Sequence, residues 1–501
     1  MTTTRAPLEG YRALRAELER AVLPLAGSID GRTFTLQASL DGLELELGGY
    51  VVIEGDGTPA LGQVRSLEAA TTEAGTVGLA GPGGDEGALS ARLMLRMAVG
   101  TGLVLDGAPG PFHDRLVRPA KPEEVRAWAE RAAGSTERLP VGTLALAPGV
   151  PAELDAGGFD RHTFLCGQSG SGKSYSLGVV LEQLLLRTGL RIIVLDPNSD
   201  LARFREVRDD ADPAEAERWR SLAGAIAIRS AAGEDADRLR LRLDELEPAH
   251  QGAVLRLDPI AEREEYAELR ALIATERPES VAELERAERP GAQALALRIA
   301  NLGTSSLGVW ARGRGRTAMD ALADESIRCL VLDIGSLETP EEQTLVAGAV
   351  LERLWRLRKR RSPVLLVIDE AHNVCPAEPA DPLTALATAR AVQIAGEGRK
   401  FGIHLLVATQ RPAKVHENVL SQCDNLILMR MNSPADTAIV RETHGFAPPG
   451  LVDRATSFAL GEALVAGKIA PHPAFIRFGH RVTREGGGDV GAAAPGDAPV
   501  A

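Results

Sequence analysis

Residues 167–174 read Gly-Gln-Ser-Gly-Ser-Gly-Lys-Ser, a complete G-x-x-x-x-G-K-[ST] phosphate loop. The apolar stretch Thr163–Cys166 precedes the loop, and the helix-patterned run Leu177–Leu186 follows it. In this strand–loop–helix setting, glycines let backbone N–H groups converge on a phosphate, and the helix N-terminus adds its positive dipole. The loop therefore predicts a nucleotide-binding α/β domain rather than a Gly/Ser-rich surface loop.

The polar side chains of the phosphate loop have separate tasks. In such a loop the Lys173 ammonium reaches the β- and γ-phosphates, and the Ser174 hydroxyl ligates Mg²⁺. The expected cofactors are therefore ATP and Mg²⁺. The candidate nucleotide-binding residues are Gly167, Gln168, Ser169, Gly170, Ser171, Gly172, Lys173, Ser174 and Tyr175.

Three later apolar segments end in Asp and compete for the carboxylate on the metal side: Ile192–Asp196, Cys329–Asp333 and Val364–Asp369. Only the third is followed at once by a second acid, Glu370. Hydrolysis needs one carboxylate for the hydrated metal and another that polarises the attacking water, so Asp369 and Glu370 divide these tasks. The other two aspartates are expected to cap turns after their strands.

The next apolar strand, His404–Thr409, ends in Gln410. A polar side chain at that tip lies near the γ-phosphate, so Gln410 is a candidate sensor that orients water. The alternative is a glutamine that satisfies a turn backbone. Upstream, Arg399 is a candidate arginine finger that acts in its own subunit or in a neighbour's. Composition alone favours a plain solvated arginine equally.

Length and composition limit the remaining possibilities. The 501 residues suffice for two or three domains, and a net charge of −13 excludes a globally basic coat but not a local basic channel for nucleic acid. The four cysteines form no C-x-x-C pair, so neither a disulfide framework nor a zinc site is expected. Because no signal peptide or 18-residue apolar run is found, we expect a cytoplasmic protein without a membrane anchor.

The hydrophobic period changes along the chain and predicts its domains. An amphipathic helix comes first, followed by short strands with a period of two, a proline-rich linker and then alternating strands and helices. We expect an N-terminal helix at 8–26 within residues 1–27, a small all-β barrel at 28–108 and a linker with a short helix at 109–140. An α/β domain is expected at 141–483, with a largely helical insertion at about 203–325 that includes a strand at 225–228. The last expected unit is a disordered tail at 484–501.

The helix expected at Glu341–Arg361 ends in a cationic run, Arg-Leu-Arg-Lys-Arg-Arg, at residues 356–361. The simplest interpretation is a helix C-terminus whose cations complement the helix dipole. Contact with DNA is the alternative that remains open.

Together these motifs resemble the HerA-type ATPases of the HerA/FtsK group of ring-forming DNA pumps. The resemblance implies an α/β P-loop NTPase fold, RecA-like and of the additional-strand, catalytic-Glu type, with a small N-terminal β-barrel and a helical insertion. It covers about residues 28–483. The segments that carry it are GGYVVIEGDGTPALGQV (48–64), RHTFLCGQSGSGKS (161–174), LDPNSD (195–200), LVIDEAHNVCP (366–376), GRKFGIHLLVATQRP (398–412), VLSQCDNLILMRMNSPAD (419–436) and LGEALVAG (460–467).

The resemblance also implies roles for single residues. Lys173 and Ser174 would bind nucleotide and Mg²⁺, Asp369 would hold the metal and Glu370 would activate water. Gln410 would be the sensor, and Arg399 a finger that acts across a subunit boundary. The family often has a His-Gly-Glu turn after the second strand where this chain has Pro197-Asn198-Ser199-Asp200, so a coupling role for that turn is not carried over.

The function implied by the resemblance is that of an ATP-driven, helicase-like translocase of double-stranded DNA that acts as a homo-hexameric ring. The implied settings are DNA repair, end processing or phage defence, and the implied partner is a nuclease or a defence effector. A nucleotide-dependent switch or scaffold ATPase and a conjugation-type coupling ATPase, which normally carries a membrane anchor, are the alternatives. Asp369–His372 also spells the box of DEAH helicases, but the chain after it is too short for a second RecA-like lobe.

Overall fold

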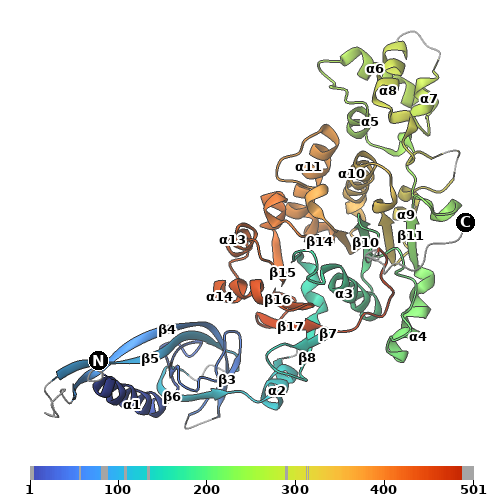
Figure 1. Cartoon of the computed structure of the whole chain (residues 1–501). Helices are drawn as coiled ribbons and strands as arrows, with labels where there is room; N and C mark the ends of the chain where they lie inside the picture. The colour runs from blue at the N-terminus through green and yellow to red at the C-terminus, as the bar shows by residue number, and fades with distance from the viewer. Residues whose placement is uncertain are drawn as a thin grey trace, which may run out of the picture.

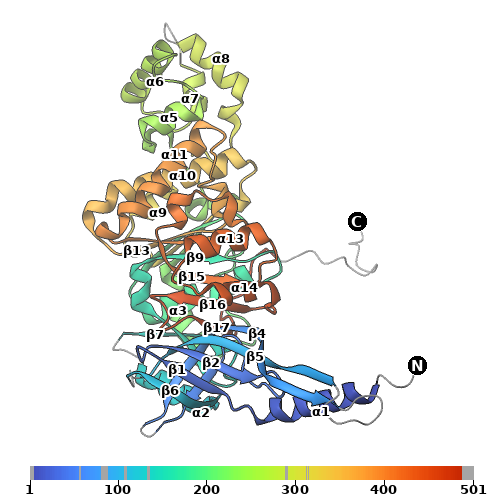
Figure 2. The same ribbon diagram turned by 90° about the vertical axis from the view of Figure 1, so that its left-hand side faces the viewer.

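The computed structural model describes residues 5–55, 58–79, 89–106, 110–132, 136–287, 292–311, 313 and 315–487. A β-barrel lies at one end of the molecule, a large α/β sheet in the middle and a small group of helices at the other end (Figure 1). The turned view shows the same three parts stacked in a column (Figure 2). The helices at the far end are α5 (Pro248–Val254), α6 (Arg263–Glu276), α7 (Val281–Glu285) and α8 (Ala292–Leu302).

The middle part is one sheet of eleven strands in the order β11-β12-β10-β13-β14-β9-β15-β16-β17-β7-β8. The strands from β11 to β15 are parallel, and those from β15 to β8 pair antiparallel. β14 (Ile403–Thr409) lies between the phosphate-loop strand β9 (His162–Cys166) and β13 (Val364–Ile368), which confirms the additional-strand arrangement. The other strands are β7 (Arg138–Leu144), β8 (Pro151–Asp155), β10 (Arg191–Asp196), β11 (Ile226–Ser230), β12 (Cys329–Asp333), β15 (Cys423–Met429), β16 (Glu462–Gly467) and β17 (Ala474–Phe478).

Helices cover both faces of the parallel strands, which is why these strands read as continuous apolar runs. In β13, Leu366 and Ile368 belong to one hydrophobic core, with α10 (Pro340–Leu357) and α11 (Pro382–Glu397). Leu365 and Val367 point to the other face and belong to a second core, with α3 (Lys173–Arg187). The remaining helices are α2 (Pro122–Ala132), α4 (Pro213–Leu222), α9 (Ala318–Ala323), α12 (Glu417–Leu420), α13 (Pro434–Thr443) and α14 (Pro449–Asp453).

The N-terminal strands form a closed barrel in the order β1-β2-β5-β4-β3-β6. The expected limits of 28–108 are too short, because β6 (Phe112–Pro119) pairs with β1 and β3 and closes the barrel. The surrounding prolines indicated a linker, yet Pro119 is the last residue of β6. The other strands are β1 (Leu25–Ser28), β2 (Thr33–Ser39), β3 (Tyr50–Ile53), β4 (Ala60–Leu79) and β5 (Leu89–Val104).

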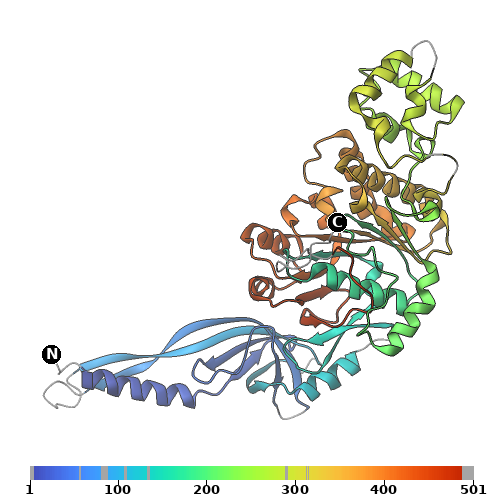
Figure 3. The ribbon, with the colours of Figure 1, turned by 45° about the vertical axis from the view of Figure 1, so that its right-hand side comes forward.

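β4 and β5 continue beyond the barrel as a two-stranded ribbon, and α1 (Arg5–Ala21) lies along it (Figure 3). The Glu19 carboxylate is buried and accepts hydrogen bonds from the backbone N–H and the guanidinium of Arg96, each at 2.7 Å. Helix α1 was expected to reach residue 26, but it ends at Ala21, three residues before Pro24, and β1 begins at Leu25.

In the described residues of the expected insertion at 203–325, short helices and turns accompany the strand β11 (Ile226–Ser230). The strand expected at 225–228 is confirmed as β11, but it joins the main sheet by pairing in parallel with β12. It is therefore an edge strand of the central domain rather than part of a separate helical unit.

The tail that was expected to be disordered starts inside the fold. Residues 479–487, here named the C-terminal strap, run back over α3 and the turn after β10. The fully buried Glu182 of α3 accepts hydrogen bonds from the N–H groups of Val482 and Thr483 at 2.8 and 2.9 Å. Gly486 N–H donates to the Asp200 carbonyl at 3.0 Å. Residues 484–487 are thus held in place, whereas 488–501 lie outside the described residues.

Two further sequence expectations concern cysteines and membranes. All four cysteines are free and buried, as expected without a disulfide framework. Within the described ranges, no helix has the length and apolar character needed to cross a membrane.

A buried histidine joins the barrel to the sheet. His472, between β16 and β17, has its Nε2 2.9 Å from the Tyr50 hydroxyl oxygen, and its ring packs edge-on against Tyr50 and Trp128. Gln63 of the barrel donates from Nε2 to the Pro473 carbonyl at 2.8 Å. Burial lowers the pKa of His472 from 6.5 to about 3, so the joint contains a neutral imidazole.

This joint predicts a specific sensitivity to acid. Because the folded pKa of His472 is depressed, the stability that it contributes is present above pH 6.5 and is lost as the pH falls toward 3. At pH 5 the loss is about 2 kcal/mol. We expect His472→Gln, which cannot be protonated, to remove this part of the drop in unfolding free energy between pH 7.5 and pH 5, measured by urea titration. The exposed His113 is the control, since His113→Gln should keep the parental drop; an unchanged drop in His472→Gln would contradict the prediction.

Candidate functional site

The phosphate loop connects β9 to α3 and has the backbone geometry that only glycine adopts easily. Gly170 and Gly172 have φ angles of 71° and 92°, in the left-handed region. A Cβ on Gly167 would lie 2.7 Å from both Met429 Cβ and Ser171 Oγ, so a side chain there would displace the loop. The open, glycine-lined backbone fits a bound phosphate group.

Residues just after β15 hold the loop in place through one side chain and two backbone groups. Arg430 donates from Nη2 to the Gly170 carbonyl at 2.8 Å, and Gln168 N–H donates to the Arg430 carbonyl at 2.9 Å. Asn432 N–H donates to Gln168 Oε1 at 3.0 Å. The sequence analysis did not identify Arg430, because nothing in its local sequence shows that β15 lies beside β9.

Lys173 lies between the loop and the two predicted carboxylates. Its buried ammonium is in direct contact with Asp369 Oδ1 and lies 3.1 Å from Glu370 Oε1. Burial opposes the charge, but the two carboxylates outweigh it and raise the pKa of Lys173. Burial by itself would raise the pKa of Glu370. The attraction to Lys173 and the hydrogen bond from Gln410 outweigh burial and lower this pKa, so the carboxylate is ionised.

The chain turns sharply at Glu370, and the turn aims its side chain at β14. Glu370 has φ 43° and ψ 51°, a left-handed conformation that is uncommon for a residue with a side chain and is found at functional sites. Its Oε1 accepts a hydrogen bond from Gln410 Nε2 at 2.9 Å. The structure therefore brings together four predicted site residues: Lys173, Asp369, Glu370 and Gln410.

A cavity of about 570 Å³ lies over the phosphate loop. Most of the predicted nucleotide-binding residues line it, whereas Gly167 and Ser171 lie beneath the surface of the loop. Its far wall comes from the end of β17 and from the C-terminal strap, and the sequence analysis missed these residues because they lie far from the loop along the chain. The lining residues are Gln168, Ser169, Gly170, Gly172, Lys173, Ser174, Tyr175, Ser176, Gln410, Leu460, Gly461, Phe478, Gly479, His480 and Glu485.

The residues beside Lys173 fit Mg²⁺ bound together with a phosphate. Among the described residues, no group of three or more His, Cys, Asp or Glu side chains could hold a metal by itself. Mg²⁺ commonly takes only one or two protein ligands and completes its shell with phosphate oxygens and water. Ser174 and Asp369 match that pattern. Asp200 is a neighbour of this pair: burial raises its pKa, and a hydrogen bond from Ser174 opposes the shift.

The other two strand-end aspartates cap turns, as expected. Asp196 accepts hydrogen bonds from the N–H groups of Asp200 and Leu201 at 3.1 and 2.8 Å. Asp333 accepts from the Ser199 hydroxyl at 2.7 Å and from Ser336 N–H at 3.2 Å. Neither carboxylate contacts Lys173, so the choice of Asp369 and Glu370 agrees with the geometry.

Arg399 lies away from the nucleotide cavity of its own chain. It precedes β14, whose seven residues separate it from Gln410 by about 20 Å. Its guanidinium donates to Asp424 Oδ2 at 2.6 Å. Arg399 is therefore not among the residues that line the nucleotide cavity of its own chain, and a role in a neighbour's site stays a prediction.

The cationic run at 356–361 is largely engaged in contacts within the chain. Arg356 pairs with Glu247, and the Arg358 guanidinium lies 4.4 Å from the Trp355 ring centroid. Arg360 lies 3.5 Å from Glu325. These contacts favour the structural interpretation of the run over contact with DNA.

The position of Lys173 predicts its contribution to nucleotide binding. Lys173→Ala removes the positive charge that lies between the phosphates and the two buried carboxylates, so repulsion replaces attraction. We expect ATP affinity to fall at least about 100-fold, measured by titration with a fluorescent ATP analogue. Lys414→Ala, on an exposed turn after β14, should bind like the parent. Equal affinity in Lys173→Ala would show that this loop is not the nucleotide site.

Comparisons with known proteins identify relatives of the segment that contains the phosphate loop. Residues 139–296 match the family described as "Helicase HerA, central domain". The "DNA double-strand break repair helicase HerA" of Sulfurisphaera tokodaii is 39% identical over 115 residues, which cover 23% of this chain and 22% of that protein. The protein of the same name from Pyrococcus furiosus is 26% identical over 413 residues, 68% of this chain and 69% of that protein.

The relatives differ in how much of their own length the alignment covers. The alignments with the relatives from Sulfurisphaera tokodaii and Sulfolobus acidocaldarius cover less than a third of those proteins. Among solved structures, VirB4 of Thermoanaerobacter pseudethanolicus superposes with a TM-score of 0.47 at 18% identity, over 70% of this chain and 97% of that chain.

Proposed function

Because this chain carries a HerA-type ATPase domain, we propose that it is an ATP-driven motor that moves double-stranded DNA as a ring-forming, helicase-like translocase. The HerA relatives are named as DNA double-strand break repair helicases. The proposed setting is correspondingly DNA repair or end processing, with phage defence as the other context in which such a motor serves.

The observation that carries the ATPase part is the cluster of Lys173, Asp369, Glu370 and Gln410 around the phosphate loop. Lys173 binds the β- and γ-phosphates, while Ser174 and Asp369 hold Mg²⁺. Mg²⁺ bound there would neutralise part of the negative charge of the phosphates. The ionised Glu370 accepts a proton from the attacking water, and Gln410 orients that water and the carboxylate.

The ring is supported by the place of Arg399. Because its own site lies at the opposite end of β14, an arginine finger at this position must serve a neighbouring subunit. Head-to-tail contacts generate rings where the rotation between subunits closes, and we propose a homo-hexamer. The net charge of −13 means that DNA is bound by local surfaces rather than by the protein as a whole.

A nuclease or a defence effector is the proposed partner. The four free, buried cysteines fit a reducing compartment, so we place the motor in the cytoplasm.

The motor proposal predicts that DNA stimulates hydrolysis. Parent protein should hydrolyse ATP faster with duplex DNA than without it, and should displace a triplex-forming strand from that duplex. Glu370→Gln should bind ATP yet lose about 10²–10⁴-fold in turnover, because only the general base is removed. Asp333→Asn, which changes a turn cap, should retain turnover. ATP hydrolysis that ignores DNA, without triplex displacement, would instead identify a nucleotide-dependent switch or scaffold.

The trans arrangement of Arg399 is tested by mixing variants. Arg399→Ala should bind ATP normally and lose about 10³–10⁵-fold in turnover. Mixed with Glu370→Gln subunits, it should recover part of the activity, because some interfaces then combine an intact Glu370 with a neighbour's intact Arg399. Mixed rings are verified by native mass spectrometry. If verified mixed rings recover no activity at any ratio, Arg399 does not act across the interface.

A further inference from the structure

The C-terminal strap is a fixed wall of the nucleotide cavity, although it comes from the end of the chain. Its backbone pairs with the segment that follows β10, where Arg208 N–H donates to the Val482 carbonyl at 2.9 Å. Arg481 N–H donates to the Tyr175 hydroxyl oxygen at 2.8 Å. The strap is therefore tied to the first turn of α3, directly after the phosphate loop.

The two faces of the strap differ. Arg481 is fully buried, and its Nε donates to Glu182 Oε1 of α3 at 3.3 Å. A Cβ on Gly178 of α3 would lie 2.6 Å from the guanidinium carbon of Arg481, so this close approach needs a glycine. His480 and Glu485, in contrast, are exposed and line the nucleotide cavity. The strap thus packs one face against the helix and presents two polar side chains to the cavity.

The site described above sets the direction of a bound nucleotide. Lys173 binds the β- and γ-phosphates, and Gln410 with Glu370 marks the γ-phosphate end, because water attacks there. The nucleoside is attached to the other end of the triphosphate, so it extends away from Gln410 within the same cavity. There it meets the far wall, which comes from the end of β17 and from the strap.

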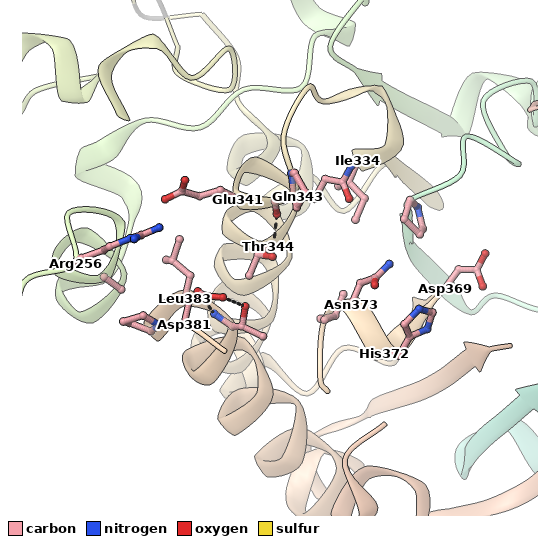
Figure 4. A pocket seen from close by; sticks show the side chains of 16 residues that line it. Arg256, Ile334, Glu341, Gln343, Thr344, Asp369, His372, Asn373, Asp381 and Leu383 are labelled. Carbon is pink, nitrogen blue, oxygen red and sulfur yellow. Dashed lines mark hydrogen bonds between the residues drawn. The ribbon is translucent and has the colours of Figure 1, made fainter. Parts of the chain in front are cut away.

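A second cavity, of about 450 Å³, also lies close to the site. It is found among the first turns of α10 and α11, and Figure 4 shows Asp369 and His372 along one side of it, with Arg256 and Asp381 on the opposite side. Among the described residues that line it, none belongs to the phosphate loop. A nucleotide whose phosphates occupy the loop therefore has its nucleoside in the first cavity.

The far wall of the first cavity has the chemistry that a nucleoside requires. Leu460 is 68% exposed, although its Cδ1 would lie only 3.5 Å from a Cβ on Gly172 of the loop, and such an apolar side chain can cover one face of a base. His480 has an aromatic ring of the kind that stacks on bases. The Glu485 carboxylate would repel phosphates, but it accepts hydrogen bonds and so matches the hydroxyls of a ribose.

We propose that the C-terminal strap is the nucleoside-binding wall of the site: Glu485 accepts hydrogen bonds from the ribose hydroxyls, while His480 and Leu460 enclose the base. This role rests on the proposed ATPase function. It adds the part of the site that the phosphate loop does not provide, namely the distinction between a nucleotide and a bare phosphate chain.

Ligands with and without a nucleoside test this assignment. ADP and pyrophosphate, each with Mg²⁺, share two linked phosphates and are compared by titration calorimetry. His480→Ala should lower the affinity for ADP about tenfold, the scale of one base-stacking contact, and leave the affinity for pyrophosphate unchanged. Lys173→Ala should weaken both ligands, because it acts on the phosphates.

The ribose contact is tested with 2′,3′-dideoxy-ADP, which lacks both ribose hydroxyls. Glu485→Ala should lower the affinity for ADP about tenfold, the scale of one hydrogen bond to a charged group, and should leave dideoxy-ADP and pyrophosphate unaffected. Asp209→Ala is the matched control. The Asp209 carboxylate is exposed and pairs with Arg484 of the strap at 2.7 Å, but it does not line the cavity, so this variant should bind all three ligands like the parent.

The outcomes separate the strap from the rest of the site. Parental affinity for ADP in His480→Ala or in Glu485→Ala would overturn the proposal. Equal losses for ADP and pyrophosphate would also overturn it, because they would place the effect at the phosphates. Both side chains are exposed, and pyrophosphate binding reports that the loop is folded. A parent protein that shows these ligand preferences but hydrolyses no ATP would refute the proposed motor and leave the nucleoside site standing, so the two failures are distinguishable.

Discussion

A single buried charge organises the centre of this protein. The Lys173 ammonium is enclosed by the phosphate loop on one side and by Asp369 and Glu370 on the other. A buried charge without partners costs several kcal/mol, so the fold must bring the start of α3 and the end of β13 together. Gln410, at the end of β14, completes the cluster by binding Glu370. The parallel sheet achieves this because the carboxyl ends of its strands meet at one edge.

The same sheet connects the nucleotide cavity to the barrel through one hairpin. At one end of β16 and β17, Gly461 N–H donates to the Ser171 carbonyl of the phosphate loop at 3.1 Å, and Phe478 lines the cavity. At the other end, His472 packs into the barrel against Tyr50. The hairpin of β16 and β17 therefore contacts the phosphate loop at one end and the barrel at the other.

The C-terminal strap adds a second connection to the cavity. Fully buried Glu182, on the helix that follows the phosphate loop, holds the backbone of Val482 and Thr483 and the guanidinium of Arg481. Breaking a buried pair of this kind is strongly destabilising, since it leaves one charge uncompensated. His480 of the strap reaches the nucleotide cavity, so the end of the chain forms part of the site that its centre encodes.

Local sequence was enough to identify the phosphate loop, the strand that ends in Asp369 and the additional strand that ends in Gln410. Each is a short pattern whose geometry is set by glycine conformation or by the burial of an apolar run. The tertiary structure alone decided which distant segments meet: that β6 closes the barrel, that β11 joins the main sheet and that the strap lines the cavity. The hydrogen bond from Gln410 to Glu370 belongs to the same group. It depends on the left-handed turn at Glu370 and on the packing of β14 beside it, and the local sequence pattern encodes neither of these.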